Sequence, residues 1–105
     1  MNPNTPTQTP APRPLPAEAQ IVADFQKAKQ IIAKMVKEDR KSRGLTLNDF
    51  GPAVGISRAT MSRVERCEDG MQLSTFFRLA HAMRISPSDF LWKVDRALKA
   101  SNNND

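Results

Sequence analysis

The sequence predicts an all-α domain of five helices, and three observations support this prediction. Apolar residues recur three and four positions apart over residues 17–42 and again in shorter segments. Helix-capping residues at Thr46, Ser57 and Ser86 each precede such a segment. Alternation of apolar and polar residues never persists over the length of a strand. With 105 residues, 39% of them hydrophobic, the chain can bury one modest core but not two.

The first helix is expected over residues 17–42, after Pro16. Its end is marked by basic residues followed by Gly44. The apolar stripe consists of Ile21, Phe25, Ala28, Ile32 and Met35. This helix is long for so small a protein, so its first half needs a partner surface, either within the chain or on another copy.

Four shorter helices are expected to follow. Thr46 caps the second, which Gly55 ends, and Ser57 caps the third. The fourth begins at about residues 73–75, and Ser86 caps the fifth, with Pro87 in its first turn. The apolar residues of these helices are, in order, Leu47, Phe50 and Val54; Met61 and Val64; Phe76, Leu79, Ala80 and Met83; and Phe90, Leu91, Val94 and Leu98.

The two ends of the chain are expected to lie outside this domain, which spans residues 17–100. Six of the eight prolines fall within residues 1–16, a composition that predicts a disordered arm. A short proline-rich ligand is the alternative for this segment. Residues 101–105 form a polar tail.

Composition excludes several classes of function. There is no apolar run long enough to span a membrane and no signal peptide, so we expect a cytoplasmic protein. One cysteine, Cys67, and one histidine, His81, form no metal site of known spacing, and no cofactor is expected. No carboxylate pair or nucleophile–base set suggests an enzyme. The net charge of +5 favours a polyanionic partner, while acids in the first helix argue against a membrane surface.

The most informative stretch is residues 46–66, in which a helix, a glycine turn and a second helix follow one another. At about 100° per residue, five residues of the helix that Ser57 caps fall within an arc of about 140°, and this arc faces away from Met61 and Val64. This face carries Arg58, Ala59, Ser62, Arg63 and Arg66. Arginine pairs with guanine in the major groove, and small residues permit close approach. An ordinary solvated basic face is the alternative interpretation.

The same stretch resembles the helix-turn-helix domain of phage Cro and lambda-type repressors, the Xre family. The family pattern is matched without a gap from about residue 32 to residue 91. The matching positions are Arg40, Arg43-Gly44-Leu45-Thr46, Val54-Gly55-Ile56-Ser57, Ser62-Arg63-Val64-Glu65-Arg66, Leu79-Ala80 and Ile85-Ser86. The resemblance implies a five-helix lambda-repressor-like fold and sequence-specific binding of double-stranded DNA.

The resemblance also assigns roles by position. Arg58, Ala59, Ser62 and Arg63 occupy the places of the family's base-reading residues. Supporting or backbone contacts to DNA are implied for Thr46, Asn48, Ser57, Thr60, Arg66 and Arg43. Arg40 and Glu65 look like the family's internal ion pair, which ties the first helix to the third.

Several residues depart from the family pattern. Leu47 stands where the family usually has glutamine, and Cys67 stands where it has glycine. Pro52, after Gly51, is expected to kink or shorten the second helix. Glu68 and Asp69 place acids in a loop near the expected phosphates.

The leading functional hypothesis is a repressor or autoregulator that binds an inverted-repeat operator as a homodimer, with half-sites one helical turn (~34 Å) apart. The alternative is a protein-binding module, such as an antitoxin that neutralises a toxin partner and autoregulates its operon. Three large apolar residues in a row cannot all face inward on one helix, so a dimer contact is predicted on the last helix. Its residues are Phe90, Leu91, Trp92 and Val94. The stripe Ile21, Phe25 and Ala28 is the rival dimer surface, unless it packs against the last helix of the same chain.

Overall fold

The computed structural model describes residues 17–68 and 70–103, and over these residues it is all-helical. The predicted arm at 1–16 lies outside the described residues. The elements are α1 (Glu18–Ser42), α2 (Leu47–Phe50), the 3-10 helix η2 (Pro52–Val54), α3 (Arg58–Glu65), α4 (Leu73–Ala82) and α5 (Pro87–Asn103). The predicted five-helix fold is confirmed, with η2 as an addition between the second and third helices.

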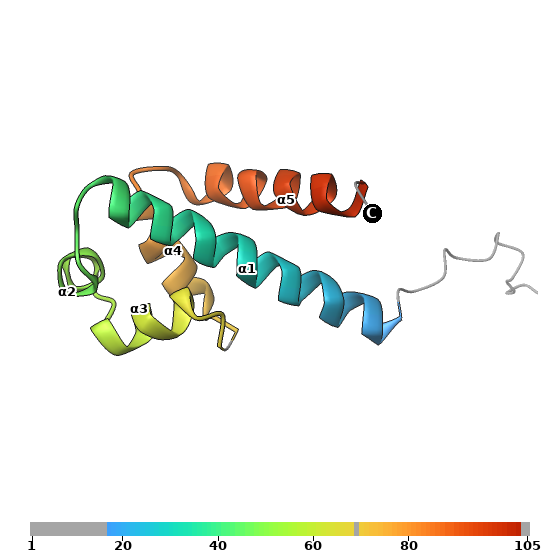
Figure 1. Cartoon of the computed structure of the whole chain (residues 1–105), viewed down its shortest axis with the longest axis horizontal. Coiled ribbons are helices and arrows are strands. Elements are labelled where there is room, and N and C mark those ends of the chain that lie inside the picture. The colour runs from blue at the N-terminus through green and yellow to red at the C-terminus, as the bar shows by residue number, and fades with distance from the viewer. Residues whose placement is uncertain (1–16, 69, 104–105) are drawn as a thin grey trace, which may run out of the picture.

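The long helix α1 lies between two groups of elements (Figure 1). On one side it packs against α5, which runs antiparallel to it, and on the other it packs against α3. Helix α4 contacts both α5 and η2. Because α1 contacts the elements on both sides, it is the scaffold on which the short helices are positioned.

The core is formed by one large side chain from each of four helices. Val36, Met61, Leu79 and Phe90 are fully buried and come from α1, α3, α4 and α5. The ring of Phe90 stacks on that of Phe76, with the centroids 4.4 Å apart. Each such side chain stabilises the fold by roughly 1.5–3 kcal/mol relative to exposure. The core therefore depends on residues distant in sequence.

The second helix is short, as the proline predicts. Helix α2 ends at Phe50, and Pro52 begins η2. Proline lacks a backbone N–H donor, which costs nothing at the start of a helix. Gly51 between them is buried, and a Cβ there would lie 2.5 Å from Met61 Cγ and 2.6 Å from the Ile56 carbonyl oxygen. A residue without a Cβ is therefore needed at Gly51, where the end of α2 passes close to Ile56 and Met61.

The last helix is longer than the sequence suggested. Helix α5 includes residues 101–103, which the sequence predicts to be part of a polar tail outside the domain. Asn102 accepts a hydrogen bond from Lys27 Nζ at 3.1 Å, so this last turn is attached to α1. Over the described residues, no helix combines the length and the hydropathy needed to cross a lipid bilayer.

Two residues of the predicted dimer contact on α5 are corrected by the structure. Phe90 and Val94 are buried in the core, so neither is available to a second chain. Leu91 and Trp92 are exposed, at 58% and 57% of their surface. The expectation that this apolar run cannot all face inward is confirmed, but only two of its members reach the surface.

Cys67 adopts a left-handed backbone conformation with φ of 58° at the end of α3, a conformation that favours glycine. We predict that Cys67→Gly stabilises the fold by about 0.5–1 kcal/mol, because removal of Cβ strain outweighs the added chain entropy of glycine. Urea unfolding followed by circular dichroism measures this change. Cys67→Ala is the matched control, since it removes the thiol and keeps Cβ. Equal stability of the two variants would contradict the backbone explanation.

Candidate nucleic-acid interface

Helix α3 begins at a well-defined cap. The Ser57 hydroxyl oxygen accepts a hydrogen bond from the backbone N–H of Thr60 at 3.1 Å, and the same hydroxyl lies 3.0 Å from Thr60 Oγ1. Met61, one turn into the helix, is fully buried and anchors it to the core. The supporting roles predicted for Ser57 and Thr60 therefore include a structural one, since they form the start of α3.

The predicted reading face of α3 lies on the molecular surface. Arg58, Ala59 and Arg63 are exposed, and Ser62 is half-buried beside them. Over the described residues, Arg58 makes no hydrogen bond or ion pair, so its guanidinium is free to bind a ligand. The structure thus places the four predicted base-reading residues together on one surface, with the buried Met61 on the opposite side of the helix.

The basic residues at the end of α3 have local partners. Arg63 Nη2 lies 3.5 Å from Thr60 Oγ1, at the limit of a hydrogen bond. Arg66 forms an exposed ion pair with Glu68, with Nε and Oε2 2.9 Å apart. Exposed pairs of this kind contribute about 0–1 kcal/mol, so Arg66 can exchange Glu68 for a phosphate at low cost.

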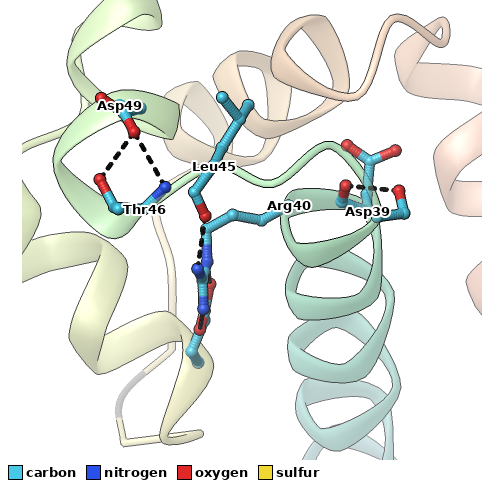
Figure 2. Close-up of polar contacts among 7 residues, drawn as sticks. Asp39, Arg40, Leu45, Thr46 and Asp49 are labelled. Atoms are coloured by element: carbon cyan, nitrogen blue, oxygen red, sulfur yellow. Dashed lines mark hydrogen bonds and ion pairs between the residues drawn. The ribbon is translucent and has the colours of Figure 1, made fainter.

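The predicted ion pair between α1 and α3 is confirmed and is two-pronged. Arg40 Nε donates to Glu65 Oε2 at 2.8 Å, and Nη2 donates to Oε1 at 3.0 Å. The remaining nitrogen, Nη1, donates to the Leu45 carbonyl oxygen at 2.7 Å (Figure 2). The side chains of Arg40 and Glu65 are only 12% and 6% exposed. The hydrogen bond to Glu65 raises the pKa of Arg40 above its ordinary value, so the guanidinium stays charged.

Arg43, predicted as a DNA backbone contact, has an internal role instead. Its guanidinium donates to the carbonyl oxygens of Ala82 and Met83, at 2.9 and 3.2 Å, at the end of α4. It also pairs with Asp39, Nε to Oδ2, at 3.4 Å. These carbonyls have no partner within the helix, and a cation is favoured at a helix C-terminus. Arg43 is therefore committed to joining α1 to α4.

Thr46 is also engaged within the chain. Its backbone N–H and its hydroxyl both donate to Asp49 Oδ2, at 3.0 and 2.8 Å (Figure 2). These bonds, the backbone one first, lower the pKa of the Asp49 carboxyl, so the contact persists at neutral pH and is lost only in acid. The predicted contact between the Thr46 side chain and a DNA phosphate becomes less favourable, because Asp49 places a negative charge beside Thr46. Asn48 is exposed at the same end of α2.

Arg78 on α4 supports the turn before α3, and no feature of the sequence predicted this role. Its Nη1 donates to the Val54 carbonyl oxygen at 2.8 Å, within the turn that joins α2 and η2 to α3. The same guanidinium covers Gly55, which has a positive φ of 81°. No local signal predicts this contact, because Arg78 lies 24 residues from its acceptor.

A shallow groove of about 300 Å³ runs between α3 and the start of α4. The residues that line it are Thr60, Arg63, Val64, Gly70, Met71, Gln72 and Thr75. Arg63 therefore belongs both to the exposed surface of α3 and to this groove. Among the described residues, Arg63 is the only ionisable side chain in the lining, so the groove extends the polar surface of α3.

These features define a helix-turn-helix unit, in which the buried end of α2, a glycine turn and an exposed basic helix are held by one core. A family profile described as HTH_3, helix-turn-helix, matches residues 36–90. The chain belongs to this HTH_3 helix-turn-helix family, and the resemblance inferred from the sequence is confirmed.

Curated relatives and a solved structure agree with this assignment. The chain is 31% identical over 55 residues to two proteins named antitoxin HipB, from Escherichia coli O6:H1 (strain CFT073) and Escherichia coli K12. The match covers 52% of this chain but only 58% and 62% of those relatives. A crystal structure of an HTH_3 family transcriptional regulator from Vibrio cholerae superimposes with a TM-score of 0.55 and 33% identity, covering 67% of this chain and 39% of that one.

We predict that Arg40→Ala destabilises the fold by about 2–3 kcal/mol, because Glu65 and the Leu45 carbonyl both lose a charged donor. Chemical denaturation gives the free energy of unfolding. Lys99→Ala, which breaks the exposed pair with Asp95, is the control and should change stability by less than about 0.5 kcal/mol. If the two variants lose the same stability, the Arg40 pair is no more than a surface contact.

Proposed function

We propose that this chain is a sequence-specific DNA-binding transcription regulator that inserts α3 into the major groove. The observation that carries the proposal is the exposed face of Arg58, Ala59, Ser62 and Arg63 on a helix anchored through Met61. An arginine guanidinium matches the O6 and N7 acceptors of guanine, and alanine allows close contact with a thymine methyl group. The helix is fixed by the core and by the Arg40–Glu65 pair, so these groups are presented in a constant arrangement.

Contacts to the DNA backbone follow from the same placement. At the start of α3, the backbone N–H groups of Arg58 and Ala59 and the hydroxyl groups of Ser57 and Thr60 lie where a phosphate can bind, and Asn48 is exposed on α2. Arg66 adds a cation at the other end of α3 once it leaves Glu68. Arg43 is not part of this proposal, because its donors are used at the end of α4.

The regulator acts as a homodimer on an inverted repeat and serves as a repressor or an autoregulator. A single short helix reads only a few base pairs, whereas two copies related by a two-fold axis double the recognised sequence. The excess of positive charge supports nonspecific attraction to DNA before the site is found. The HTH_3 family transcriptional regulator with a similar structure supports this role.

Selection of bound sequences from a random DNA pool tests this function directly. Enrichment of one inverted repeat supports a dimeric operator-binding regulator. With that site in hand, Arg63→Ala should weaken binding by roughly 1–3 kcal/mol and relax the preference at one base pair. Arg96→Ala removes the same charge from α5 and should weaken binding to all sequences slightly and equally. If Arg63→Ala also lowers affinity equally on every sequence, Arg63 contacts only phosphate.

A second candidate function is that of an antitoxin, which the similarity to proteins named antitoxin HipB favours. In this case the chain binds a toxic protein partner and also represses the operon that encodes both. The test is to purify the tagged chain from its own cells, identify any stoichiometric partner, and express that partner alone. Growth arrest that is relieved by co-expression of this chain supports the antitoxin role. A partner without toxicity, or the absence of a stoichiometric partner, contradicts it.

A further inference from the structure

The apolar stripe of α1 continues beyond the edge of the core. At about 100° per residue, Ile21, Val22 and Phe25 lie on the same side of the helix as the fully buried Val36. Their side chains are nevertheless 54%, 47% and 48% exposed. We call the segment from Glu18 to Phe25 the α1 tip. Its apolar residues are positioned as core residues are, yet the folded chain leaves them about half open to water.

Neighbouring segments of the chain cover the apolar stripe of α1 only as far as Phe25. The loop between α3 and α4 reaches as far as Phe25, because a Cβ on Gly70 would lie 3.1 Å from the Phe25 ring. At the start of the same loop, Cys67 Sγ lies 3.8 Å from the Lys29 carbonyl oxygen, which places this part of the loop beside α1. The last turn of α5 reaches α1 at Lys27. The stripe is therefore partly covered at Phe25 and open toward Glu18.

We propose that a second copy of this chain covers the α1 tip, with the two α1 helices antiparallel and related by a two-fold axis between Ile21 and Val22. This proposal deepens the homodimeric DNA binding proposed above and rests on it. In this arrangement Ile21 of each copy lies level with Val22 of the other, and Glu18 lies level with Phe25. The apolar residues of the tip recur at the three- and four-residue spacing of paired helices.

The charges of the tip are complementary to a second copy of the same tip. The ammonium group of Lys29 lies 5.2 Å from the centre of the Phe25 ring. Because Glu18 of the second copy comes level with that ring, its carboxylate approaches this ammonium group. The two-fold axis creates the same pair twice. Self-complementarity of this kind is what an isologous interface requires.

The position of α3 along α1 agrees with this axis. Cys67, just after α3, contacts Lys29, which is about 11 Å from the midpoint of Ile21 and Val22 at 1.5 Å per residue. Helix α3 is about 12 Å long and extends from there away from the α1 tip (Figure 1). Measured along α1, its centre thus lies roughly 17 Å from the axis, and the two copies of α3 are displaced by roughly 35 Å in that direction. One turn of DNA separates successive major-groove sites by about the same distance (~34 Å).

The exposed residues of α5 are a weaker candidate for the second copy. Leu91 and Trp92 are flanked by the polar residues Ser88 and Asp95, which line the same shallow hollow. The guanidinium of Arg96 lies 4.9 Å from the centre of the Trp92 ring and covers part of it. Leu91 and Trp92 thus form a short apolar patch beside polar side chains of α5, whereas the tip residues continue the core stripe of α1.

Sedimentation equilibrium of the full chain without DNA tests the proposal. We expect a reversible dimer, and Phe25→Glu should weaken its association at least about tenfold by removing apolar contact and adding a charge. Glu18→Lys and Lys29→Glu should each weaken it by about twofold to fivefold, and their combination should restore it. The control carries Leu91→Glu and Trp92→Glu together and should dimerise as the unmodified chain does. Circular dichroism confirms that each variant remains folded.

Two outcomes would overturn the proposal: a chain that stays monomeric up to about 100 µM, or a dimer abolished by the α5 variant and not by Phe25→Glu. Binding to a single half-site separates this result from the proposed function. Phe25→Glu should bind one half-site as the unmodified chain does and lose only its advantage on the inverted repeat. A stable dimer that binds no DNA sequence preferentially would contradict the DNA-binding function and leave the interface intact.

Discussion

The two-pronged pair between Arg40 and Glu65 is the interaction on which the arrangement of the helix-turn-helix depends. Through its three hydrogen bonds, Arg40 connects α1 to the last turn of α3 and to the chain entering α2. Both side chains are largely removed from water, so either one left alone would carry a costly unpaired charge. The pair therefore specifies one position of α3 relative to α1, which apolar packing alone would specify less sharply.

This constraint matters because α3 is too short to be stable by itself. An isolated helix of eight residues does not form appreciably in water, since nucleation costs more than its few hydrogen bonds return. Its structure comes from the Ser57 cap, the Met61 side chain buried opposite the reading face, and the Glu65 pair at the edge of that face. The residues that stabilise the helix are thus different from the four proposed to read bases. The exposed face can change its sequence without loss of the fold.

Five arginines in this protein form two groups that differ in their hydrogen-bond partners and not in their position in the sequence. Arg40, Arg43 and Arg78 each donate to backbone carbonyls of another segment and hold the short helices in place. Arg58 and Arg63 lie exposed on α3. A substitution in the first group acts on the fold, whereas one in the second group acts on the ligand. The net charge of the chain therefore overstates the charge available to DNA.

Local patterns in the sequence were enough to predict all five helices, the effect of Pro52 on α2 and the exposed face of α3. These features depend on residues within a turn or two of each other, and capping and periodicity describe such short-range interactions well. The Arg40–Glu65 pair was predicted only through the family resemblance, because 25 residues separate its members.

Tertiary structure decided what each surface residue is free to do. It placed Phe90 and Val94 in the core, engaged Arg43 at the end of α4, and extended α5 through residues 101–103 beside α1. Arg78 entered the site for the same reason, across 24 residues of sequence. Composition and periodicity determine which residues are apolar or charged and which helix face they occupy. Only the packing of distant segments determines whether that face meets another helix or water.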